Sequence, residues 1–454
     1  MRRFWPTVCA LAGLALLVTG CTSRRPSAAL PPTGTPIAVV AATTAIPPAP
    51  PATAAAPAPT RAPARPAPLS VVVETLPTAT PIGATLRRQV FNEVWNTINE
   101  KYLYPDFGGV DWAAVRDEFA PRIETVPSDE AFFTLLSEMV GRLRDDHSRF
   151  LPPSAAQRED IRTTGREEQV GIGVIGLPLS DGLLIQHVFP ASPAERAGLR
   201  ARDRIVAIDG EFYADGDIQG PVGSQVRLTV VRPGAQSRDI VITRRHVEGR
   251  IGPTALRLAG DIGYLSVTTL WVADMDQQVS EALSTLTTPA PMRGLILDLR
   301  SNPGGWRSVM TGILGHFVAG EVGSFTSRMG DMPLVIKPGA APDLRGIPLV
   351  VLVDDTTASY AEVIAAVLQR RAGAVVVGAP TAGNTETIYS YELSGGARLW
   401  VAQEGFRLSD GASLEGIGVQ PDILALDDWT RFSLADDPGI GSALKLLNRS
   451  AGGQ

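Results

Sequence analysis

The residue best placed for chemistry in this sequence is Ser359, which lies between an apolar run and a segment of helical spacing. The run Leu349–Val353 is typical of a buried strand, and residues 360–370 are typical of an amphipathic helix. A serine at such a corner points out of the end of a sheet, and the first N–H groups of the helix have no partner within it. This arrangement suits acyl transfer, in which a hydroxyl attacks a carbonyl and N–H groups stabilise the oxyanion.

The same residues also fit a purely structural role. Ser359 and Glu362 have the spacing of a capping box, in which a serine and a glutamate three residues later satisfy free amides at the start of a helix. The two roles use the same backbone and are compatible. The spacing alone therefore leaves both open.

An α/β pattern surrounds this corner over residues 249–430, ahead of a C-terminal tail at 431–454. Apolar runs alternate with segments of helical spacing, and one glycine turn leads into a helix that we expect to end at Val318. Such alternation indicates a mainly parallel sheet covered by helices. The expected elements are strands at 262–267 and 294–300, a helix at 274–286 and the turn at 302–305.

Residues 1–20 have the features of an export signal. Arg2 and Arg3 precede an apolar run that is too short to span a bilayer, and small residues stand directly before Cys21. This resembles a bacterial lipoprotein signal, which implies cleavage before Cys21 and attachment of lipid to its thiol. We therefore expect an exported protein that is anchored by lipid to the cell membrane and faces outside the cytoplasm.

Composition excludes several classes of site and partner. Residues 21–83 are rich in Pro, Ala and Thr, which is typical of an extended linker. The two cysteines, Cys9 and Cys21, belong to the signal and the anchor, so the folded domains have no thiol for a disulfide, a metal or a nucleophile. No HExxH or CxxC motif is present, and we expect neither a metal nor a cofactor. The net charge of −6, without a basic stripe, disfavours a nucleic-acid partner, and we expect none.

Residues 84–165 have helical periodicity. Large apolar residues recur at helical spacing from Phe91 onward, a second helix is expected over Trp112–Ile123, and Ser128 is the expected cap of a third. The third helix ends in a turn that carries His147. This histidine is therefore expected on a turn and not on an apolar face.

Residues 166–248 change to short strands and turns and resemble a PDZ domain. The likeness rests on the glycine loop of Gly171, Ile172 and Gly173, on the SPAERAGL segment and on the strand DRIVAIDG. In PDZ domains this loop holds the terminal carboxylate of a peptide that adds as an extra strand. The segment after DRIVAIDG is too short for the second PDZ helix. We therefore expect a shortened domain, which either binds peptide or serves as a packing module.

In order, the segments from residue 86 to 422 resemble the C-terminal processing peptidases, also called tail-specific proteases. The motifs are LRDDHSRFL, LILDLRSNPGG, VLVDDTTASYAEVIAAVL, VVVGAPTAGN and LEGIGVQPDI. The resemblance implies a crotonase-like or ClpP-like α/β peptidase domain with an inserted PDZ-like domain and an N-terminal helical region. It also implies a serine-type endopeptidase that hydrolyses polypeptides, including from the C-terminal end, without a cofactor.

The resemblance assigns Ser359 as the nucleophile. The N–H of Tyr360 and a second N–H from Gly304 or Gly305 would form the oxyanion hole, since glycine lets the main chain approach a carbonyl. Asn384 stands where relatives with a Ser/Lys dyad have the lysine, and an amide does not accept a proton near neutral pH. The three lysines of the chain lie elsewhere, at Lys101, Lys337 and Lys445.

Another branch of the superfamily, similar to the tricorn core protease, uses a histidine and a glutamate. His147 and Glu415 occupy the matching places in this sequence. A neutral imidazole can take the serine proton and return it to the leaving amine if a carboxylate or hydroxyl orients the ring. The candidates for that orienting role are Asp146, Ser148 and Glu415.

Two alternatives remain open. A relative that lost its lysine without a replacement would bind polypeptides as a scaffold or adaptor without cleaving them. A pure PDZ-type scaffold would still bind peptides without residues 249 onward. The discriminating feature is geometric, because a base at His147 has to lie within reach of Ser359.

Overall fold

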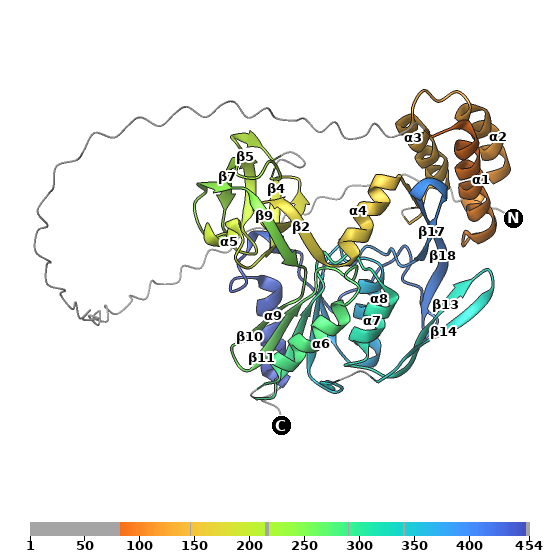
Figure 1. Ribbon diagram of the computed structural model, residues 1–454. Helices are drawn as coiled ribbons and strands as arrows, with labels where there is room; N and C mark the ends of the chain where they lie inside the picture. Colours follow the sequence, from red (N-terminus) through yellow and green to blue (C-terminus); the bar gives the residue numbers. More distant parts are fainter. Residues whose placement is uncertain (1–81, 146, 214–217, 289, 339–340, 451–454) are drawn as a thin grey trace, which may run out of the picture. The chain divides into compact units, whose positions relative to one another are not determined.

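The computed structural model describes most of the chain after the linker (Figure 1). The predicted signal peptide, Cys21, nearly all of the predicted linker and Asp146 lie outside the described residues. Within the described part, no helix is both long and apolar enough to cross a membrane. The described residues are 82–145, 147–213, 218–288, 290–338 and 341–450.

A six-stranded sheet lies at the centre of the C-terminal part of the chain (Figure 1). Strand β10 pairs antiparallel at one edge, and the other strands run parallel. Every residue of β12 and β15 is buried, which explains their uninterrupted apolar runs. The predicted α/β fold is thereby confirmed. In sheet order the strands are β10 (Thr254–Leu258), β11 (Ile262–Ser266), β12 (Gly294–Asp298), β15 (Leu349–Val353), β16 (Val375–Gly378) and β19 (Ile423–Leu424).

Helices cover both faces of this sheet. Side chains such as Leu297 and Val351 pack on one face against α6, α7 and α8. Their sequence neighbours Ile296 and Val350 pack on the other face against α9, as the two-residue period of a strand requires. The helices are α6 (Met275–Leu286), α7 (Arg307–Leu314), α8 (Tyr360–Arg371) and α9 (Pro438–Ser450).

One predicted helix boundary is wrong. The helix after the glycine turn, α7, ends at Leu314 and not at Val318, because the backbone changes there to tighter three-residue hydrogen bonds. His316 therefore lies beyond the helix. One of its ring nitrogens contacts Ser280 Oγ and the other the carbonyl oxygen of Pro342, each at 2.8 Å. The ring is thus used in packing.

A second sheet connects the N-terminal helices with the C-terminal part. Its long strand β18 pairs with β1, β13 and β17, and its side chains Leu399 and Val401 share a core with α1, α2 and α3. Because β1 follows His147 closely, its pairing with β18 holds this histidine beside the C-terminal part. The elements are α1 (Ala84–Lys101), α2 (Trp112–Ile123, as predicted), α3 (Asp129–Val140), β1 (Arg149–Leu151), α4 (Pro153–Thr163), β13 (Gly320–Ser327), β14 (Gly330–Ile336), β17 (Thr387–Glu392) and β18 (Arg398–Leu408).

A small β domain is inserted between these parts. Strands β2 and β9 pair with each other at its entry and exit, and its own sheet has the order β3-β4-β5-β7-β8 with β6 beside β5. Its only helix among the described residues is the short α5. Residues 214–217, in the segment where no second PDZ helix was expected, lie outside the described residues, so the shortening stays a prediction. The bounds are β2 (Arg166–Gly171), β3 (Val174–Leu179), β4 (Gly182–Val188), α5 (Pro193–Arg196), β5 (Arg204–Ile208), β6 (Glu211–Phe212), β7 (Gln225–Val231), β8 (Arg238–Thr243) and β9 (Arg245–Arg250).

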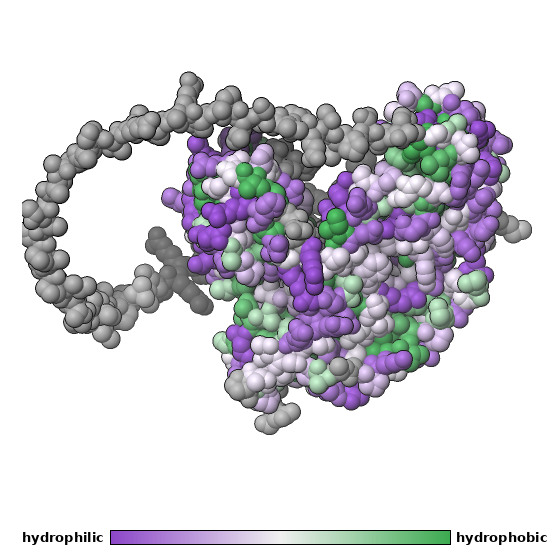
Figure 2. Space-filling model, viewed as in Figure 1, coloured by the Kyte–Doolittle hydropathy of each residue, from purple (hydrophilic) through white to green (hydrophobic). Residues whose placement is uncertain are grey.

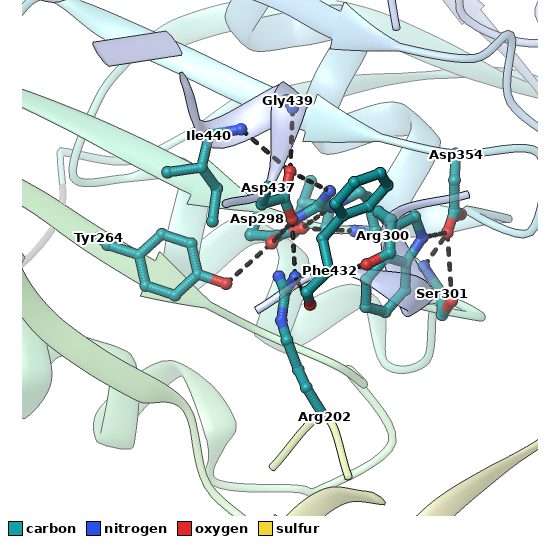
Figure 3. A network of polar contacts seen from close by, with 12 residues as sticks. Arg202, Tyr264, Asp298, Arg300, Ser301, Asp354, Phe432, Asp437, Gly439 and Ile440 are labelled. Carbon is teal, nitrogen blue, oxygen red and sulfur yellow. Dashed lines mark hydrogen bonds and ion pairs between the residues drawn. The ribbon is translucent and has the colours of Figure 1, made fainter. Parts of the chain in front are cut away.

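A buried polar network attaches this inserted domain to the central sheet (Figure 3). Arg202 of the inserted domain donates to Asp437 at 2.7 Å. Asp437 also accepts from Arg300, whose guanidinium contacts Asp298 at the end of β12 at 2.6 Å. Tyr264 donates to the same Asp298 at 2.8 Å. The network therefore fixes the carboxyl end of β12, from which the glycine turn departs.

The surface has the polarity of an ordinary globular exterior. In Figure 2 hydrophilic and intermediate side chains cover most of the visible face, and hydrophobic ones appear in separate groups. The large apolar residues are mainly used in the buried cores of the central sheet, the N-terminal helices and the inserted domain.

Candidate active site

Ser359 occupies a strained corner between β15 and α8. Its φ of 57° and ψ of −132° lie in a region that residues other than glycine rarely adopt. Its N–H donates both to the carbonyl oxygen of Asn384 at 2.8 Å and to Oε2 of Glu362 at 2.9 Å. These bonds, one to the first turn of its own helix and one to the segment of Asn384, hold the serine in this conformation.

Glu362 ties this corner to the segment that carries Asn384. The residue is fully buried, and besides Ser359 N–H its carboxylate accepts from Thr381 Oγ1 at 2.5 Å, Gly383 N at 2.7 Å and Asn384 N at 2.9 Å. Burial raises the pKa of Glu362, and these hydrogen bonds oppose that effect. The glutamate half of the predicted capping box is thus present, and it also fixes the position of Asn384 relative to Ser359.

The glycine turn lies directly against Ser359. A Cβ on Gly304, whose φ is 84°, would stand 2.6 Å from Ser359 Cβ and 3.0 Å from Tyr360 N. The Gly304 N–H is already donated to Asn302 Oδ1 at 2.9 Å. By contrast, neither Gly305 N–H nor Tyr360 N–H has an acceptor in the part of the chain that the structure describes. Two free backbone donors therefore lie close to the serine.

Leu270 sets the position of Gly305 from the other side. Its N–H donates to Gly304 O at 2.8 Å and its carbonyl accepts from Trp306 N at 3.0 Å. A Cβ on Gly305 would stand 2.1 Å from the Leu270 carbonyl carbon, so a side chain at this position would clash with the backbone. This explains why the turn has two successive glycines.

His147 is buried, with 7% of its surface exposed. Its Nε2 atom lies 3.9 Å from Glu415 Oε1 and 3.9 Å from Glu386 Oε2, which is ion-pair distance but too long for a hydrogen bond. Among the described residues Nε2 has no hydrogen-bond partner. Burial lowers the pKa of His147, but the carboxylates outweigh burial and raise it above the ordinary value of 6.5.

Glu415 is held in place by Thr385. Its Oε2 atom accepts from Thr385 N at 2.7 Å and from Thr385 Oγ1 at 3.1 Å, which leaves Oε1 facing His147. Burial raises the pKa of Glu415, but contacts with His147 and Thr385 outweigh it and hold the pKa below its ordinary value. The carboxylate is therefore ionised near neutral pH and stabilises a charged imidazole.

Glu386 was not anticipated from the sequence. It is 5% exposed, the Tyr104 hydroxyl donates to its Oε1 atom, and its Oε2 atom has no hydrogen-bond partner among the described residues. Burial raises the pKa of its carboxyl. Tyr104 is 282 positions away, so no local pattern could reveal this pair.

Ser148, one of the other candidates to orient the imidazole, has a different partner. Its Oγ accepts from the backbone N–H of Ala402 in β18 at 3.1 Å, so it secures the turn to the second sheet. Asp146 lies outside the described residues. The carboxylates of Glu415 and Glu386 are thus the described groups that face the imidazole nitrogen.

A cavity of about 560 Å³ brings these residues together. Its lining includes Ser359, His147, Asn384, Gly305 and Glu386. Glu415 contacts His147 from outside this lining. No hydrogen bond joins His147 to Ser359 within the described residues, so the imidazole would have to move toward the serine to act on it. No group of three or more potential metal ligands occurs in the described part of the chain.

Comparison with known proteins adds independent evidence. Residues 261–425 match the profile of peptidase family S41, residues 84–141 that of the tricorn protease C1 domain, and residues 185–211 that of a PDZ domain. The chain is 30% identical to the carboxyl-terminal-processing peptidase 2, chloroplastic, of Arabidopsis thaliana over 384 residues, which are 78% of this chain and 72% of the relative. This chain belongs to the carboxyl-terminal-processing peptidases of family S41.

Other relatives agree with this assignment. This S41 serine peptidase is 28% identical over 387 residues to a carboxyl-terminal-processing protease of Synechocystis sp., covering 82% of this chain and 89% of that protein. The solved structure of a photosystem II D1 C-terminal processing protease matches with a TM-score of 0.51 at 24% identity, covering 78% of this chain and 96% of that one. This last likeness concerns the fold.

The PDZ-like loop of this S41 peptidase is largely used within its own domain. Ile172 is fully buried, and its carbonyl accepts from Ala194 N at 2.8 Å. The carbonyl of Gly173 accepts from Phe189 N at 3.0 Å, and Gly171 ends β2. The loop therefore docks the α5 segment, and a role in carboxylate binding stays a prediction.

Proposed function

We propose that this S41 peptidase hydrolyses polypeptides through an acyl-enzyme on Ser359, with His147 in place of the family lysine. The observation that carries the proposal is that His147 shares the serine's cavity while two carboxylates face its Nε2 atom. Asn384, at the lysine position, also lines the cavity, but its amide cannot accept the serine proton near neutral pH. Histidine is thus the best-placed base in this cavity.

In the first step Ser359 Oγ attacks the scissile carbonyl and its proton passes to His147. The carbonyl oxygen becomes an oxyanion, which accepts from the free N–H groups of Gly305 and Tyr360. The tetrahedral intermediate then collapses, the C–N bond breaks, and the imidazolium gives its proton to the departing amine. This leaves an ester on Ser359.

Hydrolysis of the ester repeats the sequence with water. His147 takes a proton from the water, whose oxygen attacks the ester carbonyl, and the proton returns to Ser359 Oγ as the acid product leaves. Glu415 stabilises the imidazolium in both halves of the reaction, because its negative charge stands 3.9 Å from Nε2. Thr385 holds that carboxylate, so it acts as a positioning residue.

Cleavage from the C-terminal end and export are further parts of the proposal. The relatives from Synechocystis sp. and Arabidopsis thaliana are named carboxyl-terminal-processing enzymes, which supports a similar use of this site. The arginine pair, the short apolar run and Cys21 support lipid attachment outside the cytoplasm. Globomycin-sensitive cleavage and a lipid mass on Cys21 would test the anchor, and a variant with Cys21→Ser serves as the control.

The test of the site is cleavage of casein and of tailed peptides by the wild type, Ser359→Ala and His147→Ala. We expect loss of cleavage in both variants, while His246→Ala, an exposed histidine in β9, serves as the matched control and remains active. Full activity in His147→Ala would eliminate histidine as the base.

The alternative is an inactive relative that only binds polypeptides. It is favoured by the missing hydrogen bond between His147 and Ser359. A fluorophosphonate probe separates the two, because a nucleophilic serine forms a covalent adduct whose mass maps to Ser359. Absence of labelling and of cleavage, with peptide binding retained, would support the alternative.

A further inference from the structure

Three tryptophans form one wall of the cavity that contains Ser359. Trp271, Trp306 and Trp400 all line it. The ring centroid of Trp271 lies 5.1 Å from that of Trp306 and 5.7 Å from that of Trp400, and the Trp306 and Trp400 centroids are 6.4 Å apart. The first two pairs are nearly perpendicular, at 76° and 77°, which is a favourable edge-to-face arrangement. The wall is therefore a connected aromatic surface.

Hydrogen bonds hold this tryptophan wall in position. Trp306 Nε1 donates to the carbonyl oxygen of Trp271 at 2.9 Å, and Trp400 Nε1 donates to Glu159 Oε2 at 2.9 Å. The polar atoms of these two indoles are thus satisfied away from the cavity. Trp271 and Trp306 are only half-buried, so part of their apolar ring surface is free to contact a ligand.

The wall lies next to the proposed oxyanion donors. Trp306 directly follows Gly305, and Trp271 directly follows Leu270, which pairs with Gly305. A substrate carbonyl that accepts from Gly305 N–H is bonded to the Cα atom of its own residue. The side chain of that residue therefore has to pass close to the tryptophan wall.

Two arginines lie beside the tryptophan wall. The Arg149 guanidinium lies 5.4 Å from the Trp400 ring centroid and retains 41% side-chain exposure. Arg307 also lines the cavity and is paired with Glu404. Arg149 in turn pairs with Glu159 at 3.3 Å, so both guanidinium groups already have a carboxylate partner. The wall itself offers a lysine or arginine side chain no carboxylate to pair with. The wall itself offers an acidic or amide side chain little compensation for desolvation.

We propose that the tryptophan wall is a subsite for an aromatic or large apolar side chain, carried by the residue that supplies the scissile carbonyl. This rests on the proposed peptidase function of the same cavity. Aromatic side chains gain most, because they bury large apolar area and make edge or offset ring contacts. The expected order of preference is Phe, Tyr and Trp, then Leu and Met, then Ala, with Lys last.

The experiment varies only that residue in a set of otherwise identical internally quenched peptides. We expect kcat/KM for the Phe peptide to exceed that for the Ala peptide at least tenfold. In Trp271→Ala and Trp306→Ala the ratio of the two kcat/KM values falls toward one. Met329→Ala, a fully exposed residue at the β13–β14 hairpin, is the matched control and keeps the ratio.

Several results would overturn the subsite. Equal kcat/KM across the series, or a preference that appears only on the amine side of the scissile bond, contradicts it while leaving the peptidase function intact. Trp306→Phe keeps a ring, so it should retain the preference even if the alanine variant fails to fold.

If the wild type cleaves no peptide, binding of the Phe and Ala peptides to Ser359→Ala separates the subsite proposal from the peptidase proposal. Binding is measured by the quenching of tryptophan fluorescence. At least tenfold tighter binding of the Phe peptide supports the subsite although the peptidase function has failed. Equal binding overturns the subsite.

Discussion

The Nε2 atom of His147 lies 3.9 Å from Oε1 of Glu415, although the two residues belong to opposite ends of the folded chain. The pairing of β1 with β18 positions the histidine, and the hydrogen bonds from Thr385 position the glutamate. Neither segment can form this contact alone. The acid–base part of the proposed site therefore depends on docking of the N-terminal helical region.

Replacing Glu415 with glutamine should reduce kcat/KM by about 10²- to 10⁴-fold, the range seen when the acidic partner of a catalytic histidine loses its charge. The amide keeps the size of the side chain but no longer stabilises the imidazolium. The measurement is steady-state cleavage of a quenched peptide. Glu321→Gln, on the exposed face of β13, should leave the rate unchanged, and an equally active Glu415→Gln enzyme would remove this residue from the mechanism.

The pH dependence of kcat/KM should reveal the second carboxylate. His147 acts as a base only when neutral, and the carboxylates around it raise its pKa above 6.5. We therefore expect kcat/KM to decrease on acidification, with a midpoint above pH 6.5. Glu386→Gln removes one negative charge, which disfavours the imidazolium and lowers its pKa. The acid limb of the profile should therefore move to lower pH.

Tyr104→Phe provides an independent check on Glu386. It leaves Oε1 of Glu386 without its hydroxyl donor, which favours the protonated carboxyl and weakens its effect on His147. The acid limb should then shift in the same direction as in Glu386→Gln. Profiles that coincide with the wild type in both variants would show that Glu386 does not influence the base.

Gly304→Ala should reduce kcat/KM by about 10²-fold or more. The new Cβ would stand 2.6 Å from the Cβ of Ser359, so the nucleophile or the turn has to shift, and a displacement of about 1 Å can reduce activity 10²-fold. Gly346 is the matched control because its φ is 85° and a Cβ there meets nothing within 4 Å. Gly346→Ala should lower the free energy of unfolding by about 1–2 kcal/mol and leave kcat/KM intact. Equal loss of activity in both variants would attribute the effect to backbone strain alone.

The sequence predicts the fold well where burial determines the pattern. β12 and β15 are buried along their whole length, so their apolar runs are visible without any knowledge of tertiary structure. α7 ends at Leu314, where the backbone hydrogen-bond pattern tightens. Just beyond this end the His316 ring contacts Ser280 and Pro342, and local periodicity does not encode such tertiary contacts. The confirmed parts of the prediction are thus those that depend on local burial.

In the candidate site, too, the features that depend on distant contacts could not be predicted from the sequence. The sequence left open whether Gly304 or Gly305 supplies the second oxyanion donor, and the side chain of Asn302 favours Gly305 by occupying the Gly304 N–H. Glu386 could not be singled out, because its significance comes from a distant tyrosine and histidine. The roles of Ser359, His147 and Glu415 stay predictions that the kinetic tests address.

Asn384→Ala should have a small effect if histidine is the base. The Asn384 backbone carbonyl accepts from Ser359 N–H, and its N–H donates to Glu362, so the substitution keeps both contacts. We expect kcat/KM of Asn384→Ala to change less than about fivefold. For His147→Ala we expect a loss of about 10²-fold or more, as is typical when a general base is removed. A loss in Asn384→Ala as large as that in His147→Ala would instead give the amide a direct part in the reaction.

Asp437 should be the most sensitive residue of the network that attaches the inserted domain. Its carboxylate is fully buried, pairs with Arg202 and Arg300, and accepts from the first N–H groups of α9. Asp437→Ala leaves two buried arginines without this partner and should lower the free energy of unfolding by about 3–5 kcal/mol. Arg202→Ala should have a smaller effect, because Arg300 still pairs with the carboxylate.

The dependence of stability on pH follows from the same contacts. Burial raises the pKa of Asp437, but Arg300 and Arg202 outweigh it and hold the pKa below its ordinary value of 3.8. A depressed folded-state pKa contributes stability above the unfolded value, and this contribution is lost as the pH falls through the folded value. The free energy of unfolding, measured by denaturant titration from pH 7 down to pH 3, should therefore fall in the wild type and fall less in Asp437→Asn. An identical dependence of this free energy on pH in the two proteins would contradict the assignment.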